Sequence, residues 1–311
     1  MTSRGQRIAI VGPTAAGKSD LAVELGLRLG GEVVNADSMQ LYRGMDIGTA
    51  KLPQSQRRGV PHHLLDVWDV TRGATVAEFQ ELAVAAVVDV VTRAAPALLV
   101  GGSGLYVNAV VDQWEFPGTD PLVRARLEAE LGELGPQALH ARLARLDPAA
   151  AVLILPTNGR RVVRALEVVQ LRGSFTASLP RPSAHDAAPD GWVLIGLDVP
   201  RVTLDERIGA RVDQMWAAGL VGEVRALERR GLRDGPTASR ALGYAQVLRL
   251  LAGEIDEAEA HAQTVRATRK FARRQDQWFH RDPRIVWLPF DAADLVARAA
   301  AVVEGRRPPG P

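Results

Sequence analysis

The sequence predicts an α/β fold, in which a parallel sheet flanked by helices is interrupted by an inserted all-helical domain. Two observations lead to this prediction. Short apolar runs alternate with helical segments, as in 8–11, 17–29 and 32–36, and a strand–helix–strand order implies parallel strands joined by a right-handed crossover. From about residue 115 the sequence pattern changes from apolar runs to charged segments with helical periodicity. We therefore expect a core formed by 1–114 and 186–311 and a helical insertion at 115–185.

Composition limits the protein class. The chain has 311 residues, of which 47% are apolar, enough for a large core. It contains no cysteine, so disulfides and thiolate chemistry are excluded. No apolar run reaches membrane-spanning length and no signal-like stretch precedes the first strand. We expect a cytoplasmic protein without membrane contact.

The loop after the first strand matches the phosphate-binding pattern G-x-x-x-x-G-K-[ST] at every fixed position. It consists of Gly12, Pro13, Thr14, Ala15, Ala16, Gly17, Lys18 and Ser19. Backbone N–H groups and the dipole of the following helix favour an anion there. Lys18 can reach the outer phosphate oxygens, and the Ser19 hydroxyl can hold Mg²⁺. The core is therefore expected to be a P-loop NTPase-like sheet.

Polar residues follow two further strands of the expected sheet. Asp37 follows the strand 32–36, and Ser103 lies in a Gly-Gly-Ser turn after the strand 97–100. Because ligands bind beyond the carboxyl ends of parallel strands, both side chains should face the phosphate loop. Phosphate-loop ATPases usually place an aspartate after such a strand. Its absence here makes nucleotide hydrolysis the weaker interpretation.

The later elements follow the same pattern. We expect helices at 75–93, 204–217, 221–230 and 245–251, strands at 192–197 and 285–288, and within the insertion helices at 121–134, 136–146 and 160–171. Thr75 is the predicted N-cap of the first of these helices, with Glu78 three residues later. The adjacent His62 and His63 lack a third ligand at metal spacing and are interpreted as loop or packing residues.

A basic stripe is expected on the helix that starts near residue 260. Its members Arg266, Arg269, Lys270, Arg273 and Arg274 fall at i, i+3, i+4, i+7 and i+8, which places all five on one face. Like charges repel there, so an anion must offset them, either a polyanion or nearby carboxylates. These carboxylates are Glu254, Asp256, Glu257 and Glu259.

Taken residue by residue, these features favour a transferase that acts between a phosphorylated small molecule and a nucleic acid. Two other functions stay open. One is a small-molecule kinase that binds ATP in the phosphate loop. The other is an RNA-binding P-loop module without transfer chemistry.

Eight segments, taken together and in order, resemble the bacterial tRNA dimethylallyltransferases, also called tRNA isopentenyltransferases. They are GPTAAGKSDLA, ADSMQLYRGMDIGTAK, PHHLLD, LLVGGSGLY, DPLVRARLE, RRVVRALEV, the bend at 240–244 and TRKFARRQ. The resemblance extends from about residue 7 to residue 288. It implies transfer of the dimethylallyl group of dimethylallyl diphosphate to N6 of the adenine immediately 3′ of the tRNA anticodon, with Mg²⁺ and release of diphosphate.

The resemblance also implies residue roles. The loop 12–19 would bind the diphosphate, with Ser19 as the Mg²⁺ ligand, and the catalytic residues would be Asp37, Ser103 and Lys18. Ser103 stands where the family usually has threonine, and Ala245 where it often has a basic residue. The segments that match the family's tRNA contacts contain Asp37, Ser38, Met39, Gln40, Ser103, Arg124, Arg160, Arg161, Val162, Val163, Arg164, Arg240, Gly243 and Tyr244. To these contacts with the tRNA anticodon stem-loop, the basic stripe adds Arg266, Arg269, Lys270 and Arg273, and we expect the protein to be a monomer.

Overall fold

The computed structural model describes residues 5–176 and 188–306. The chain divides into two compact units. One comprises Met1–Trp114 and Pro182–Pro311, and the other comprises Glu115–Arg181. The end of the insertion expected at residue 185 lies outside the described residues. Each unit is described by itself.

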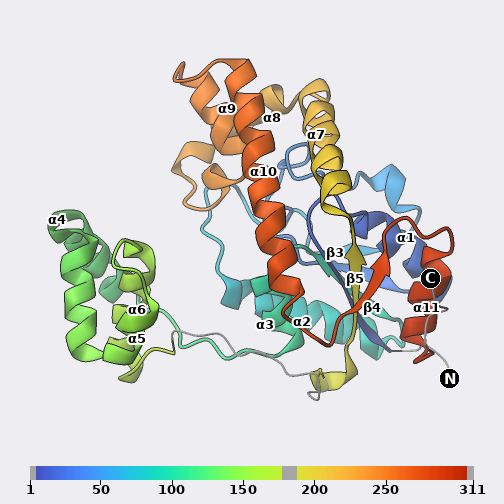
Figure 1. Ribbon diagram of the computed structural model, residues 1–311, viewed down its shortest axis with the longest axis horizontal. Helices are drawn as coiled ribbons and strands as arrows, with labels where there is room; N and C mark the ends of the chain where they lie inside the picture. Colours follow the sequence, from blue (N-terminus) through green and yellow to red (C-terminus); the bar gives the residue numbers. More distant parts are fainter. Residues whose placement is uncertain (1–4, 177–187, 307–311) are drawn as a thin grey trace. The chain divides into compact units, whose positions relative to one another are not determined.

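The larger unit is built on a six-stranded sheet in which every neighbouring pair is parallel, as predicted (Figure 1). The strand order is β3-β2-β4-β1-β5-β6. The strands are β1 (Arg7–Val11), β2 (Glu32–Asn35), β3 (His62–His63), β4 (Ala97–Gly101), β5 (Val193–Asp198) and β6 (Val286–Pro289). Strands β1 and β2 are not neighbours, because β4 pairs with both. The carboxyl ends of all six strands therefore lie along one edge.

Helices cover both faces of this sheet. Helices α1 (Lys18–Leu29) and α11 (Leu295–Val303) pack on the face that carries Ile8 and Ile10. Helices α2 (Val76–Thr92) and α3 (Gly104–Val111) cover the face that carries Ala9 and Val11. Alternate residues of β1 thus point to opposite layers, and each fully buried isoleucine contributes about 1.5–3 kcal/mol.

Local signals set several helix ends. The Thr75 side chain accepts a hydrogen bond from the Glu78 N–H at 3.2 Å, which confirms the predicted N-cap of α2. Helix α1 ends at Gly30, whose φ of 66° is the left-handed conformation that glycine adopts at little cost. Helix α11 was not predicted. Its signal was the buried set Ala299, Ala300, Val302 and Val303, which repeats with helical spacing.

The C-terminal part of the larger unit adds four more helices. They are α7 (Arg201–Ala217), α8 (Leu220–Glu228), α9 (Tyr244–Leu251) and α10 (Glu257–Phe279). Short 3₁₀ turns occur at η1 (Gln54–Arg57), η2 (Pro189–Gly191), η3 (Leu232–Asp234) and η4 (Ala238–Arg240). Helix α10 packs beside α7 and α9 (Figure 1). Among the described residues, no helix has the length and apolar character needed to cross a bilayer.

The smaller unit is a bundle of α4 (Pro121–Leu146), α5 (Pro148–Leu153) and α6 (Gly159–Arg172). Its core is formed by eleven buried apolar residues, among them Leu127, Leu139 and Leu166. Gly135 has a φ of 77° and breaks α4 into the two predicted segments. Helix α5 was not predicted as an element.

Candidate active site

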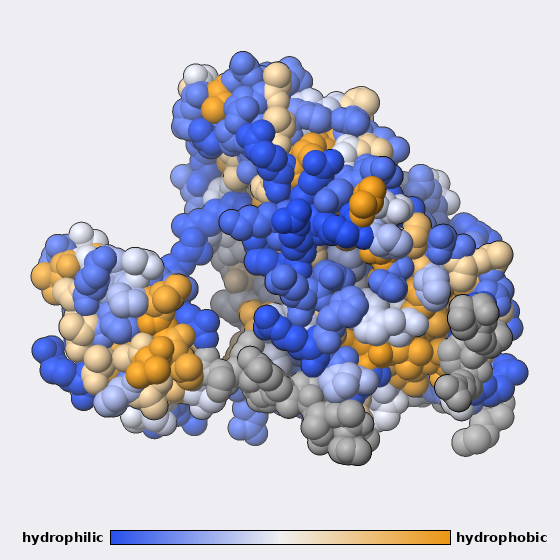
Figure 2. Space-filling view, viewed as in Figure 1, coloured by the Kyte–Doolittle hydropathy of each residue, from blue (hydrophilic) through white to orange (hydrophobic). Residues whose placement is uncertain are grey.

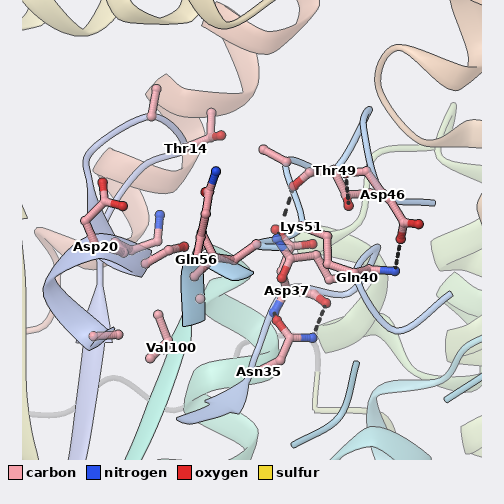
Figure 3. Close-up of a pocket in the computed structure, with 18 of the residues that line it drawn as sticks. Thr14, Asp20, Asn35, Asp37, Gln40, Asp46, Thr49, Lys51, Gln56 and Val100 are labelled. Carbon is pink, nitrogen blue, oxygen red and sulfur yellow. Dashed lines mark hydrogen bonds and ion pairs between the residues drawn. The ribbon is translucent and has the colours of Figure 1, made fainter. Parts of the chain in front are cut away.

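A cavity of about 600 Å³ opens at the carboxyl ends of β1, β2 and β4 (Figure 3). The phosphate loop forms one side of the cavity, the segment 46–53 forms another, and side chains from α7 and α10 complete it. Thr14, Asp37 and Lys51 all appear in this view around the same space. The sequence prediction that Asp37 and the loop face a common ligand therefore agrees with the cavity lining.

The loop needs both of its motif glycines. Gly12 has a φ of 137° and Gly17 a φ of 100°, values that side chains rarely adopt. A Cβ on Gly12 would also lie 3.3 Å from the Leu197 carbonyl oxygen on β5. Ala15 has a φ of 65°, and its carbonyl oxygen accepts a hydrogen bond from Arg207 Nε at 2.7 Å. Arg207 therefore helps hold a turn that is unfavourable for alanine.

The N–H groups at the start of α1 are available to an anion. Two loop N–H groups are already used, because Thr14 N–H donates to Gln275 Oε1 at 2.9 Å and Ala16 N–H donates to the Pro13 carbonyl at 3.4 Å. Those of Lys18 and Ser19 carry no hydrogen bond to another described residue. With the helix dipole behind them, they form an anion site.

Lys18 lies at the centre of this site. Its Nζ donates to the Pro13 carbonyl at 2.7 Å, which leaves two N–H bonds for a ligand. Burial and, to a smaller extent, the charge of Arg211 lower the pKa of Lys18, the charge of Asp37 opposes both, and the result is a pKa of about 8. An anionic ligand would relieve this loss of hydration and the repulsion from Arg211.

Asp37 is held in place by its neighbours. Asn35 Oδ1 accepts from the Asp37 N–H at 2.9 Å, and Asn35 Nδ2 donates to the Asp37 carbonyl at 3.0 Å (Figure 3). The carboxylate accepts from the Met39 N–H at 2.9 Å. Burial raises the pKa of Asp37, and the Met39 hydrogen bond and the charge of Lys18 partly offset the rise. The carboxylate is thus a stronger base than an exposed aspartate.

Ser103 lies next to the segment that follows Asp37. Its hydroxyl accepts from the Ser38 N–H at 3.5 Å and lies 3.4 Å from the Ser38 hydroxyl. These are long contacts that a substrate group can replace. Gly101 and Gly102, directly before Ser103, line the cavity.

The opposite side of the cavity depends on Lys51. Its Nζ donates to the Tyr42 carbonyl at 3.0 Å, to Asp46 at 2.7 Å and to Asp66 at 2.6 Å. All three N–H bonds are therefore used within the protein. This lysine was not singled out as a site residue by the sequence analysis, and its contacts indicate a structural role.

Glu223 on α8 fixes the start of the same segment. Its carboxylate accepts from the N–H groups of Asp46, Ile47 and Gly48 at 3.1, 2.7 and 3.2 Å. It also accepts from the Tyr244 hydroxyl at 2.6 Å. One carboxylate thus holds three consecutive backbone donors.

Sequence reasoning missed three residues that line or support the site. Arg211 and Gln275 line the cavity from α7 and α10, and Glu223 supports its wall. Arg211 and Glu223 belong to no contiguous motif, and Gln275 ends the segment TRKFARRQ, in which only the basic residues were singled out. For Arg211, the available signal was its spacing of four residues from Arg207 on one helix face.

Several predicted tRNA-contacting residues are buried. Gly243 is buried at the start of α9, and Tyr244 is 0% exposed beneath it. In the smaller unit, Val162 and Val163 are 0% and 2% exposed in the helical core. These four residues present no side chain to an RNA, because tertiary packing uses them.

The predicted arginines of the smaller unit have different surroundings. Arg124 and Arg164 both form ion pairs with Glu167, which is 0% exposed. They neutralise a buried carboxylate, and both guanidinium groups remain partly exposed. Arg160 and Arg161, at the start of α6, are exposed. Arg240 is also exposed, in the larger unit.

The expected basic stripe on α10 divides into two parts. Arg266 pairs with Glu259 at 2.8 Å, and Arg269 donates to the Asp205 carbonyl at 3.1 Å. Lys270 and Arg273 are exposed and form no ion pair within the described part of the chain. Figure 2 shows a strongly hydrophilic surface over this helix. Arg274, the fifth member, lies over the Phe271 ring at 5.7 Å. Glu259 and Asp205 thus offset two of the five cations of the stripe.

The described residues contain no group of three or more acidic or histidine side chains that could hold a metal ion by itself. Ser19 is exposed at the start of α1, and Asp20 and Asp37 line the same cavity. Mg²⁺ usually takes one or two protein oxygens and completes its shell with water and substrate phosphates. This donor set fits that pattern.

Comparison with known proteins identifies the family. The family model of the IPP transferases matches residues 40–282, which is most of the chain. This chain belongs to the IPP transferase family. It is 65% identical over 302 residues to a tRNA dimethylallyltransferase of Thermobifida fusca, covering 95% of this chain and 93% of the relative. A relative of the same name from Streptomyces avermitilis is 66% identical over 289 residues, with 93% and 91% covered.

Solved structures agree with this family membership. The tRNA isopentenylpyrophosphate transferase of Bacillus halodurans superposes with a TM-score of 0.71 at 40% identity, covering 97% of this chain and 95% of that one. A eukaryotic dimethylallyltransferase acting on tRNA superposes with a TM-score of 0.78 at 22% identity, covering 98% of this chain and 81% of that one. The second likeness shows a common fold.

Proposed function

We propose that this IPP transferase family member moves the dimethylallyl group of dimethylallyl diphosphate to N6 of the adenine immediately 3′ of the anticodon in tRNA. The observation that carries the proposal is one cavity lined both by an anion-binding loop with Lys18 and by the carboxylate of Asp37. An alkyl transfer with a diphosphate leaving group needs an anion site for the diphosphate and a base for the proton of the attacking amine. The names of the close relatives support the same substrates.

In the proposed reaction, the N6 nitrogen forms a bond to the first carbon of the dimethylallyl group. The carbon–oxygen bond to the diphosphate breaks, and its electron pair leaves with the diphosphate. Asp37 accepts the N6 proton, which its raised pKa favours. The free N–H groups at the start of α1, Lys18 and Arg211 stabilise the charge that grows on the diphosphate.

Gln40 is assigned to the adenine side of the cavity, and Ser103 to the turn directly behind it, since Gly101 and Gly102 line the cavity and Ser103 does not. Ser103 contacts the Ser38 backbone beside Asp37, and Gln40 lines the cavity with its side chain held by the Thr49 carbonyl at 3.1 Å. An adenine must leave its stack to reach this site. Exclusion of water then protects the allylic electrophile from hydrolysis.

Magnesium fits the same proposal. Ser19 would hold it together with oxygens of the diphosphate, and Asp20 and Asp37, which line the same cavity, would bind its water ligands. When bound, Mg²⁺ supplies positive charge that stabilises the leaving diphosphate.

The tRNA would be held by exposed basic groups. Within the larger unit these are Arg240, Lys270 and Arg273, and within the smaller unit Arg160 and Arg161. We propose that the protein acts as a cytoplasmic monomer on the anticodon stem-loop. A kinase is the less favoured function, because β4 ends in Gly101 and provides no carboxylate there.

The test is to incubate the protein with an unmodified tRNA anticodon stem-loop, dimethylallyl diphosphate and Mg²⁺, and to weigh the RNA. We expect the mass to rise by one dimethylallyl group, and an unchanged mass would refute the function. Asp37→Asn should slow transfer by about 10²–10⁴-fold and leave RNA affinity close to normal. Asp291→Asn, on an exposed carboxylate that does not line the cavity, is the matched control and should retain most of the activity.

A further inference from the structure

The turn after β4 is packed against two different elements. A Cβ added to Gly101 would lie 2.3 Å from the Ala36 carbonyl oxygen, directly before Asp37. A Cβ on Gly102 would lie 2.3 Å from Gln275 Nε2 on α10. A Cβ on Gly104 would lie 2.2 Å from Trp278 on the same helix. The glycines thus allow β2 and α10 to approach the turn that carries Ser103.

Gln275 joins this turn to the phosphate loop. Its side chain accepts a hydrogen bond from the Thr14 N–H at 2.9 Å through Oε1 and donates one to the Gly102 carbonyl at 2.9 Å through Nε2. The residue is 6% exposed. A neutral amide is needed here, because one partner is a donor and the other an acceptor.

Trp278 anchors the same helix one turn later. Its Nε1 donates to Asn108 Oδ1 on α3 at 2.8 Å. Helix α10 is therefore fixed by two hydrogen bonds, one from Gln275 to the turn after β4 and one from Trp278 to α3. Together with the close approach of Gly104, the Trp278 contact helps fix the position of Gln275.

We propose that Gln275 is a positioning residue that sets the phosphate loop and the Ser103 turn in one fixed relation. The Thr14 N–H donates to Gln275 on α10 and is therefore not available to the diphosphate. The diphosphate would instead accept hydrogen bonds from the N–H groups at the start of α1. Through this amide, the helix that bears Lys270 and Arg273 determines the shape of the diphosphate site. The proposal rests on the function proposed above for the loop.

The experiment uses the full-length protein and inorganic diphosphate with Mg²⁺ as the probe. Gln275→Met keeps the length of the side chain and loses both hydrogen bonds. We expect its affinity for diphosphate to fall by about tenfold or more, with the affinity for tRNA unchanged. Gln277→Met, on an exposed glutamine two residues later, is the matched control and should bind diphosphate like the wild type.

Gln275→Glu separates positioning from a loss of folding. A protonated glutamic acid can accept from the Thr14 N–H and donate to the Gly102 carbonyl, whereas a carboxylate repels that carbonyl. Affinity of this variant for diphosphate, relative to Gln275→Met at the same pH, should therefore rise as the pH falls from about 8 to about 6. Lys18, Asp37 and diphosphate titrate in both variants, so their effects cancel in the ratio of the two affinities.

The outcomes are distinguishable from failure of the proposed function. If the wild type does not bind diphosphate, the phosphate-loop assignment fails first. If the wild type binds diphosphate and both Gln275 variants bind it as tightly as the wild type at every pH, the positioning role is refuted. A melting temperature of Gln275→Met close to that of Gln277→Met, together with weaker diphosphate binding, supports it.

Discussion

Two lysines line opposite sides of one cavity, and their contacts differ. Lys51 donates to two carboxylates and one carbonyl, so its three N–H bonds are used within the protein. Among the described residues, Lys18 has a single acceptor, the Pro13 carbonyl, and its pKa is lowered to about 8. Lys18 is thus available to bind an anionic ligand, whereas Lys51 already donates to two carboxylates. The difference separates a ligand-binding side of the cavity from a structural side.

The sharpest test of this contrast is Lys18→Met. It removes a charged donor from the diphosphate site, and charged hydrogen bonds contribute about 1.5–3 kcal/mol, so diphosphate affinity should fall by roughly 10- to 100-fold. Calorimetric titration with inorganic diphosphate and Mg²⁺ measures this. Lys51→Met is the paired variant, and an equal loss of affinity in both would remove the distinction.

The pH dependence gives the next largest effect. Lys18 is protonated below its pKa of about 8, and only the protonated form attracts a diphosphate. Affinity for diphosphate should therefore fall as pH rises through 8, by about tenfold for each unit above that value. Binding isotherms between pH 7 and pH 9 would show the decrease. Because diphosphate and Asp37 also titrate, the quantity to compare is the ratio of wild-type affinity to Lys18→Met affinity at each pH, and this ratio should fall as the pH rises through 8.

Lys51→Met should act on stability. It leaves Asp46 and Asp66 without their shared cation, and because both carboxylates are about half exposed, water limits the cost. We expect a loss of about 1–2 kcal/mol in the free energy of unfolding. Urea denaturation measures it. Lys18→Met should not destabilise the protein, because it removes a cation whose charged form burial disfavours.

The same contrast between paired and available cations recurs on α10 and predicts a smaller effect. Replacing Lys270 and Arg273 by glutamine removes two exposed cations, which should reduce the salt dependence of tRNA binding by about 1.4 in the log–log slope. Replacing Arg266 and Arg269, which have internal partners, should change the slope much less. If both double variants reduce the salt-dependence slope equally, cations with and without internal partners contact the RNA alike, and the contrast fails.

The parts of the site that the sequence predicts are contiguous. The phosphate loop, the strand before Asp37 and the Gly-Gly-Ser turn are read from adjacent residues, because strand, turn and helix preferences act locally. Thr14 and Gln275 are 261 positions apart and meet only in the folded chain. Arg211 reaches Lys18 in the same way. No spacing rule relates such residues.

The incorrect or incomplete predictions have a similar cause. Periodicity placed Arg269 on the basic stripe, where its side chain is 42% exposed, but could not identify its partner Asp205, which belongs to another helix, α7. Tyr244 belongs to a segment that resembles an RNA-contacting one, yet its ring is buried and its hydroxyl donates to Glu223. Local pattern shows where a side chain lies along its own element. It does not show which other element covers it.

The segment 46–51 has a thermodynamic consequence for substrate binding. Glu223 and Lys51 hold it at both ends before any ligand is present. Ordering a flexible residue costs about 1–2 kcal/mol of conformational entropy, so six residues would cost on the order of 6–12 kcal/mol if they were fixed only on binding. Here folding has already met that cost. The free energy of substrate contact can therefore appear as affinity and as stabilisation of the transition state.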